Sequence, residues 1–162
     1  MSEMMNDLEA LAREQVKPFA FSRPYWEATR QKKLLVQYCR RTGQYQFYPR
    51  PTSVFTGRRD LEWREVSGAG EVFSYTIAQR GRGPFRGHEP YVIATIKLDI
   101  GINVIGNLVH CKRDDLRIGL RVVPCWTPLP GGEHILMFEP ARQAASKTAG
   151  AGRPAAQKRQ SS

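Results

Sequence analysis

A run rich in arginine and glycine, residues 79–89, separates two apolar segments of the chain and reads QRGRGPFRGHE. Arginine side chains present forked N–H donors that match phosphate oxygens, and glycines let backbone N–H groups come close to an anion. Phe85 adds a face on which an apolar or aromatic group can stack. No Lys-Ser or Lys-Thr pair follows, so the run is not a Walker loop. We name Arg80, Arg82, Phe85 and Arg86 as candidate ligand contacts; the alternative is a mobile, solvated hairpin loop.

No catalytic constellation accompanies this run. The three histidines stand at positions 88, 110 and 134, far apart in the sequence, and the chain contains neither an HExxH nor a Gly-x-Ser-x-Gly motif. His110 and Cys111 are adjacent, but neighbours on a strand point to opposite faces, so we expect a buried thiol there instead of a reactive pair. We therefore predict no catalytic residue.

A second basic group follows, and two acidic residues, Asp114 and Asp115, interrupt it. Such a mixture is typical of a locally paired, solvated surface. The basic members are Lys112, Arg113, Arg117 and Arg121.

The length of 162 residues suits one compact domain with at most a small appendage, and 41% hydrophobic content allows a core. Half of the net charge of +10 falls in residues 141–162, which hold five basic and no acidic residues, and we expect this tail to be disordered. No apolar stretch approaches the roughly 20 residues of a membrane span, so we expect a soluble, cytoplasmic protein. The three widely spaced cysteines are expected to be reduced.

The N-terminal 34 residues are predicted to form helices. Apolar residues at positions 4, 5, 8, 11 and 12 have roughly helical spacing, and Pro18 would end that helix. A second helix is expected from Ser22 as N-cap, with Pro24 in the first turn, to about residue 33. Its aromatic pair, Tyr25 and Trp26, either staples the helix onto the body or docks on a partner protein.

Short β-prone runs at 34–38 and 44–48 predict a hairpin within a ribbon of residues 35–66. From residue 71 to 137 apolar residues alternate with period two, and Asp99-Ile100-Gly101 joins two of the strands. A helical turn at 113–119 lies between the third and fourth strands. This layout predicts a mainly β chain whose residues 67–140 form an OB-fold, a five-stranded Greek-key barrel. Gly70 and Gly106 are expected where strands bend sharply.

Six segments occur in a characteristic order: RPYWE at 23–27, PRP at 49–51, SGAGEVFSYT at 67–76, PY at 90–91, LDIG at 98–101 and LRIG at 116–119. Through them the chain resembles the acyl-CoA-associated family of OB-fold proteins known as domain of unknown function thirty-five. The similarity spans about residues 22–140. It implies a rubredoxin-like zinc ribbon before the barrel.

Members of that family typically carry two Cys-x-x-Cys knuckles, a spacing that suits tetrahedral zinc. In this chain only Cys39 remains of the four thiols, and the other knuckle positions hold Thr42, Ser53 and Thr56. Hydroxyl groups stay protonated at neutral pH and are poor zinc ligands. We therefore predict a degenerate ribbon without zinc.

The resemblance implies a function beside thiolases, ketosynthase-like acyltransferases, or hydratase and aldolase subunits that act on acyl-CoA. We expect a non-catalytic accessory subunit that binds a thiolase-like or acyltransferase partner and helps to bind or channel acyl-CoA. The four candidate ligand contacts would then touch CoA, Tyr25 and Trp26 would touch the partner, and no cofactor would be bound tightly.

Three alternatives remain open: an accessory subunit of an acyl-CoA hydratase or aldolase, a single-stranded nucleic-acid-binding OB-fold module, and a stand-alone enzyme, which is the least favoured because no catalytic constellation is present. Nucleic acid is the less favoured partner because residues 67–140 carry a formal charge of only +1. The expected strand faces also lack a run of aromatic residues interleaved with Lys and Arg.

Overall fold

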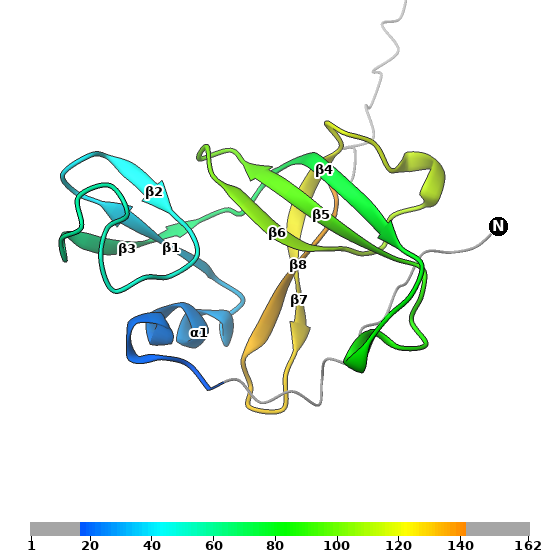
Figure 1. Ribbon diagram of the computed structural model, residues 1–162, viewed down its shortest axis with the longest axis horizontal. Helices are drawn as coiled ribbons and strands as arrows, with labels where there is room; N and C mark the ends of the chain where they lie inside the picture. The colour runs from blue at the N-terminus through cyan, green and yellow to red at the C-terminus, as the bar shows by residue number, and fades with distance from the viewer. Residues whose placement is uncertain (1–16, 142–162) are drawn as a thin grey trace, which may run out of the picture.

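The computed structural model describes residues 17–141, and these form a three-stranded ribbon sheet beside a closed five-stranded barrel (Figure 1). A short helix, α1 (Arg23–Thr29), lies beneath the ribbon and reaches the barrel. The prediction of a mainly β chain with an OB-fold barrel is confirmed. The predicted first helix and nearly all of the predicted basic tail lie outside the described residues.

The ribbon consists of β1 (Leu34–Cys39), β2 (Gln44–Gln46) and β3 (Leu61–Val66), in the antiparallel order β2-β1-β3. The predicted hairpin is confirmed, with Gly43 at φ 71° in its turn, a conformation that glycine adopts without a Cβ penalty. The third strand was not predicted. It pairs along the whole of β1, from Leu34 opposite Val66 to Cys39 opposite Leu61.

The barrel consists of β4 (Gly70–Ala78), β5 (Tyr91–Leu98), β6 (Asn103–Leu108), β7 (Arg121–Pro128) and β8 (His134–Pro140). Their order is β4-β5-β6-β8-β7, and pairing of β4 with β7 closes the barrel. The predicted helical turn is a 3-10 turn at Arg113–Asp115, between β6 and β7. Strands β6 and β8 run parallel and meet where Leu108 lies opposite Phe138.

Close approach explains two barrel glycines. A Cβ on Gly70 would lie 2.4 Å from the carbonyl oxygen of Lys97 on the neighbouring strand, so any side chain would collide with backbone. A Cβ on Gly106 would lie 3.0 Å from the ring of Phe138, which is fully buried. The sequence predicted these glycines at sharp bends of the strands. The structure adds a second reason for them, because each lets a neighbouring strand or core side chain approach closely.

Helix α1 is shorter than predicted, and it is held by the β7–β8 hairpin. The hydroxyl of Ser22 donates to the carbonyl of Phe19 (3.1 Å) and makes no N-cap hydrogen bond, because a 3-10 turn precedes the helix. Thr29 Oγ1 accepts from the backbone N–H of His134 (3.1 Å), and Arg30 forms an ion pair with Glu133. The C-terminal end of α1 is thereby fixed against the barrel.

Candidate functional site

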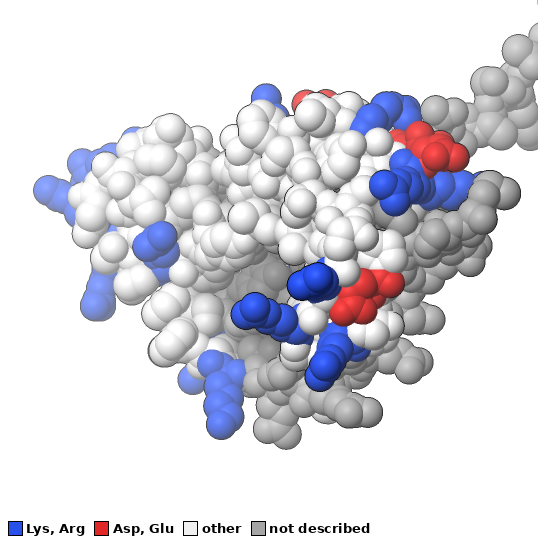
Figure 2. All heavy atoms as spheres, turned by 45° about the vertical axis from the view of Figure 1, so that its right-hand side comes forward, with Lys and Arg blue, Asp and Glu red and all other residues white. Residues whose placement is uncertain are grey.

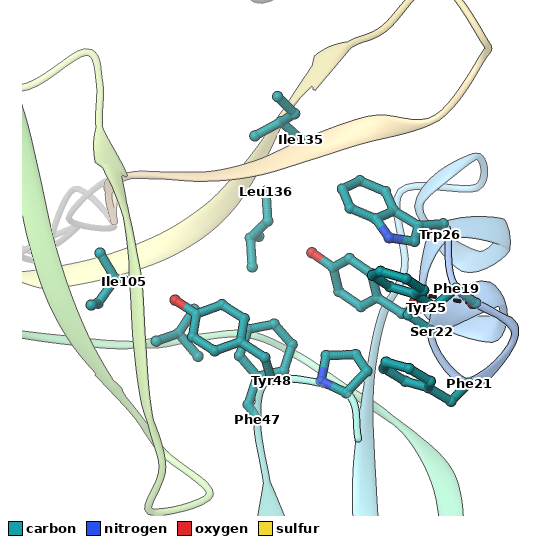
Figure 3. Close-up of a pocket in the computed structure, with 12 residues that line it drawn as sticks. Phe19, Phe21, Ser22, Tyr25, Trp26, Phe47, Tyr48, Ile105, Ile135 and Leu136 are labelled. Atoms are coloured by element: carbon teal, nitrogen blue, oxygen red, sulfur yellow. Dashed lines mark hydrogen bonds between the residues drawn. The ribbon is translucent and has the colours of Figure 1, made fainter. Parts of the chain in front are cut away.

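A groove of about 440 Å³ opens where α1, the ribbon and the barrel meet (Figure 3). Its lining is almost entirely apolar, and half of the lining residues are aromatic. We call this feature the aromatic groove and define it by Phe19, Phe21, Trp26, Tyr48, Ile105 and Leu136. The side chains come from segments far apart in the sequence, so the groove exists only in the folded chain.

Tyr25 and Trp26 occupy different positions in this groove. Tyr25 is buried and contacts the rings of Trp26 and Phe47 at centroid distances of 5.1 and 5.7 Å. Burial, with a smaller contribution from Tyr48, raises the pKa of the Tyr25 hydroxyl above its usual value. Trp26 is half-buried and lines the groove. The structure therefore places Tyr25 as a packing residue, and contact of the pair with a partner stays a prediction.

A second hollow of about 270 Å³ continues the apolar surface along the barrel. It shares Ile105, Ile135 and Leu136 with the aromatic groove. At its far end the ring of Phe85 stacks on Tyr91, with centroids 4.9 Å apart and planes 22° from parallel. We call this second hollow the barrel trough. Phe85 thus connects the trough to the arginine-rich loop.

That loop, residues 79–89, joins β4 to β5, and we call it the arginine loop. Arg80, Arg82 and Arg86 are all exposed, and Lys and Arg side chains project around the loop in Figure 2. All three arginines are therefore accessible, and their contact with a ligand stays a prediction. Phe85 is instead partly buried by its stacking on Tyr91.

Glu89 holds the arginine loop together and was missed by sequence reasoning. Its carboxylate accepts hydrogen bonds from the backbone N–H groups of Gly81 (2.6 Å) and Gly87 (2.7 Å). The sequence analysis named the glycine N–H groups of this loop as possible donors to an anion. Those of Gly81 and Gly87, two of the three, instead donate to Glu89. The three guanidinium groups of the loop are not held by Glu89, and their binding of a phosphate stays a prediction.

Replacing Glu89 with Ala should loosen the arginine loop while the barrel stays folded. Loss of the two hydrogen bonds should speed amide exchange at residues 79–89 by roughly tenfold. Hydrogen–deuterium exchange with mass spectrometry measures this, and Glu62→Ala, on the ribbon strand β3, is the control that should leave the loop unchanged. Equal exchange in the loop of both variants would show that Glu89 does not organise it.

The hydrogen bonds that the Glu89 carboxylate accepts also predict how the arginine loop depends on pH. Hydrogen bonds from the backbone N–H groups of Glu89 itself and Gly81 exceed the opposing effect of burial and lower the pKa of the Glu89 carboxyl. A carboxylate with a lowered pKa stabilises fully above its unfolded value, about 4.3, and loses its effect as the pH falls through the folded value. Loop protection should therefore stay constant from about pH 5 to 8 and fall only in acid.

The four knuckle positions lie together in the ribbon around the buried thiol of Cys39. Burial opposes ionisation of this thiol, but hydrogen bonds with Ser53 and Thr42 lower its pKa overall. Asp60, which sequence reasoning missed, lies 3.7 Å from Cys39 Sγ and accepts a hydrogen bond from Thr56 Oγ1 (3.0 Å). The ribbon keeps the geometry of two facing knuckles although the residue types differ.

A buried pair of glutamines holds the loop between β2 and β3. Gln46 donates to Gln37 Oε1 (2.9 Å) and accepts from the backbone N–H of Val54 (2.8 Å). Gln37 exchanges two hydrogen bonds of 2.8 Å with the backbone of Arg50. Uncharged amides without a motif gave no sequence signal for this role.

The pair His110 and Cys111 lies beyond the end of β6, not on a strand as expected. His110 adopts φ 54° and its Nδ1 lies 2.8 Å from Glu139 Oε2, while Cys111 is buried in the core. Within residues 17–141, no group of three or more His, Cys, Asp or Glu side chains could hold a metal ion. No helix in this described part is long and apolar enough to cross a membrane.

Two family models match the chain. The C-terminal OB-fold domain of ChsH2 matches residues 63–127, and the rubredoxin-like zinc ribbon domain of ChsH2 matches residues 26–53. The first range covers most of β3 and the barrel strands β4 to β7, and the second covers the second half of α1 with β1 and β2.

Three relatives are similar over longer stretches. A probable enoyl-CoA hydratase alpha subunit of Thermomonospora curvata is 31% identical over 117 residues, which cover 72% of this chain but only 36% of that protein. A DUF35 domain-containing scaffold protein of Pyrococcus furiosus is 30% identical over 106 residues, 65% of this chain and 77% of that protein. A solved Ltp2-ChsH2(DUF35) aldolase chain is 28% identical with a TM-score of 0.68, covering 78% of this chain and 98% of that one.

The ribbon match corrects one prediction. We predicted that zinc is absent. The family match contradicts this prediction, because residues 26–53 match a rubredoxin-like zinc ribbon, a type of domain that typically binds zinc. The prediction considered the motif residues alone, whereas the ribbon topology around Cys39 is retained. The donors there, one thiol, the Asp60 carboxylate and hydroxyls, do not fit the usual four thiolate or imidazole ligands.

Proposed function

Since this chain belongs to the DUF35 family, we propose that it is a non-catalytic accessory subunit of a complex that processes acyl-CoA. It docks on a catalytic partner and supplies part of the surface that binds the acyl-CoA. The names of its relatives support this proposal, since they include a hydratase subunit, a scaffold protein and an aldolase assembly.

One observation carries the proposal: the arginine loop holds three exposed arginines and also contributes Phe85 to the lining of the apolar barrel trough. Acyl-CoA combines phosphate groups with a long, largely apolar arm. Guanidinium groups bind phosphate through forked, charge-assisted hydrogen bonds, and the stacked rings of Phe85 and Tyr91 offer an apolar surface beside them. We propose that Arg80, Arg82 and Arg86 contact the phosphates and that Phe85 borders the arm.

The reactive groups of the complex belong to the partner in this proposal. Burial raises the pKa of the Cys125 thiol to about 12 and also raises that of Cys111, so neither is a thiolate at neutral pH. His110 is engaged with Glu139. A nucleophile or general base from the catalytic partner completes the site.

The relatives favour a particular class of partner. The names of two of those reported above mention an enoyl-CoA hydratase and an aldolase. We therefore propose a hydratase-like or aldolase-like partner first and a thiolase-like partner second. The rim of the aromatic groove, including Trp26, is the surface we assign to docking.

Co-expression with a candidate catalytic protein tests the assignment. The chain alone should turn over no enoyl-CoA or aldol substrate, and co-expression should yield one complex on size-exclusion chromatography. Omitting the chain should lower the activity or soluble yield of the partner, because an accessory subunit covers apolar surface of its partner. Turnover by the purified chain alone would refute an accessory role, and separate elution from hydratase, aldolase and thiolase candidates would refute docking.

A further inference from the structure

We propose that residues 4–15 of this chain cover the aromatic groove through their apolar stripe when no partner is bound. The proposal concerns the free chain and does not depend on the binding of acyl-CoA. It starts from the exposure of the groove. Phe19 is 71% exposed, Tyr48 52% and Ile105 58%, which leaves a continuous apolar surface open to water.

The chain enters this groove directly from the segment in question. Phe19 and Phe21 are among the first described residues, and their rings stack 5.5 Å apart within the groove. Only three residues separate position 15 from Phe19. Twelve residues in a helix would extend about 18 Å.

The pattern of the segment suits an apolar surface. Met4, Met5, Leu8 and Leu11 recur at the spacing of one helix face. Methionine adapts its shape to irregular apolar hollows, and an aromatic lining offers favourable contacts to its sulfur. Burying such a stripe against exposed aromatic rings removes apolar area from water on both sides.

Charge supports the same occupant. Residues 1–16 hold four acidic residues and one arginine, a formal charge of −3, whereas residues 17–141 hold 19 Lys and Arg against 11 Asp and Glu, a charge of +8. Exposed Arg23 and Arg50 directly follow Ser22 and Pro49, which line the groove. Asp7 and Glu14 would fall beside the apolar stripe of a helix, where these arginines can meet them.

Tethering favours this segment over a second copy of the chain. A segment attached next to the groove has an effective concentration of the order of millimolar, well above the concentration at which a small subunit is usually studied. A separate molecule would have to compete with it. The covered groove therefore predicts a monomer with little accessible apolar surface.

An apolar fluorescent dye, anilinonaphthalene sulfonate, tests the proposal on the full chain. The double variant Leu8→Asp/Leu11→Asp should increase dye fluorescence severalfold, because the stripe no longer covers the groove. The matched control Ser2→Asp/Asn6→Asp adds the same charge outside the stripe and should bind dye as weakly as the wild type. Thermal unfolding of all three proteins shows whether the barrel is intact.

A disulfide test locates the contact. Oxidation of a Leu11→Cys/Ile105→Cys variant should give an intramolecular bond between these two positions, identified by mass spectrometry, whereas Asn6→Cys/Ile105→Cys should give at least severalfold less. Strong dye binding by the wild-type chain would overturn the proposal. Weak dye binding by both the wild type and Leu8→Asp/Leu11→Asp, together with a concentration-dependent dimer, would also overturn it, because a second copy would then cover the groove.

Discussion

Replacing Phe138 with Ala is expected to lower the free energy of unfolding by about 3–5 kcal/mol, the cost of removing a large ring from a packed core. Phe138 is fully buried and stands on β8 at its junction with β6, opposite Leu108. Gly106 leaves the space that its ring fills. The substitution therefore opens a cavity at the point where the barrel closes.

Chemical denaturation followed by far-ultraviolet circular dichroism measures this loss, and Phe73→Ala is the matched control. Phe73 lies on β4 at an irregularity of the strand register and is 55% exposed. The same change there should cost less than about 1 kcal/mol, since little area leaves water at that position. Similar losses for both variants would show that Phe138 does not anchor the barrel.

The barrel was predictable because its strands carry the period-two pattern that half-buried strands require. In β5, Val92, Ala94 and Ile96 are buried and alternate with more exposed neighbours, as the sequence pattern predicts. The predicted turn at Gly101 joins β5 to β6. Strand β3 was missed because it is charged at Glu62, Arg64 and Glu65, and it becomes a strand only by pairing with β1. Its strand character thus comes from a tertiary partner.

The candidate site was predictable only in part, for a similar reason. The arginine loop is local in sequence, so its composition could indicate an anion. The aromatic groove brings Trp26 against Ile105 and Leu136, and no sequence period reports which distant segments face one another. Glu89 shows a further limit, since a lone carboxylate gave no sign that it would take up the glycine N–H groups of its own loop.

Replacing Arg80, Arg82 and Arg86 together with Ala should raise the KM for acyl-CoA of the assembled complex by roughly 100-fold or more. Hydrogen bonds to charged groups contribute about 1.5–3 kcal/mol each, so one lost phosphate contact costs about tenfold and two or three cost correspondingly more. The kcat should change little, because the partner carries the chemistry and the loop only binds the ligand. The barrel should stay folded, since all three side chains are exposed.

The second basic group provides a control with the same loss of charge. Lys112, Arg113 and Arg117 are also exposed but lie at the turn between β6 and β7, so replacing these three with Ala should leave the KM for acyl-CoA unchanged. A rise in KM for the loop variant alone assigns the effect to local contacts, whereas an equal rise in both would indicate only the general field of a basic protein.

A measurement of single-stranded nucleic-acid binding at several salt concentrations tests the alternative function. Binding that depends on counterion release falls steeply as the salt concentration rises. Unchanged KM in the loop variant, together with sequence-selective nucleic-acid binding that resists salt, would replace the acyl-CoA assignment by the nucleic-acid one.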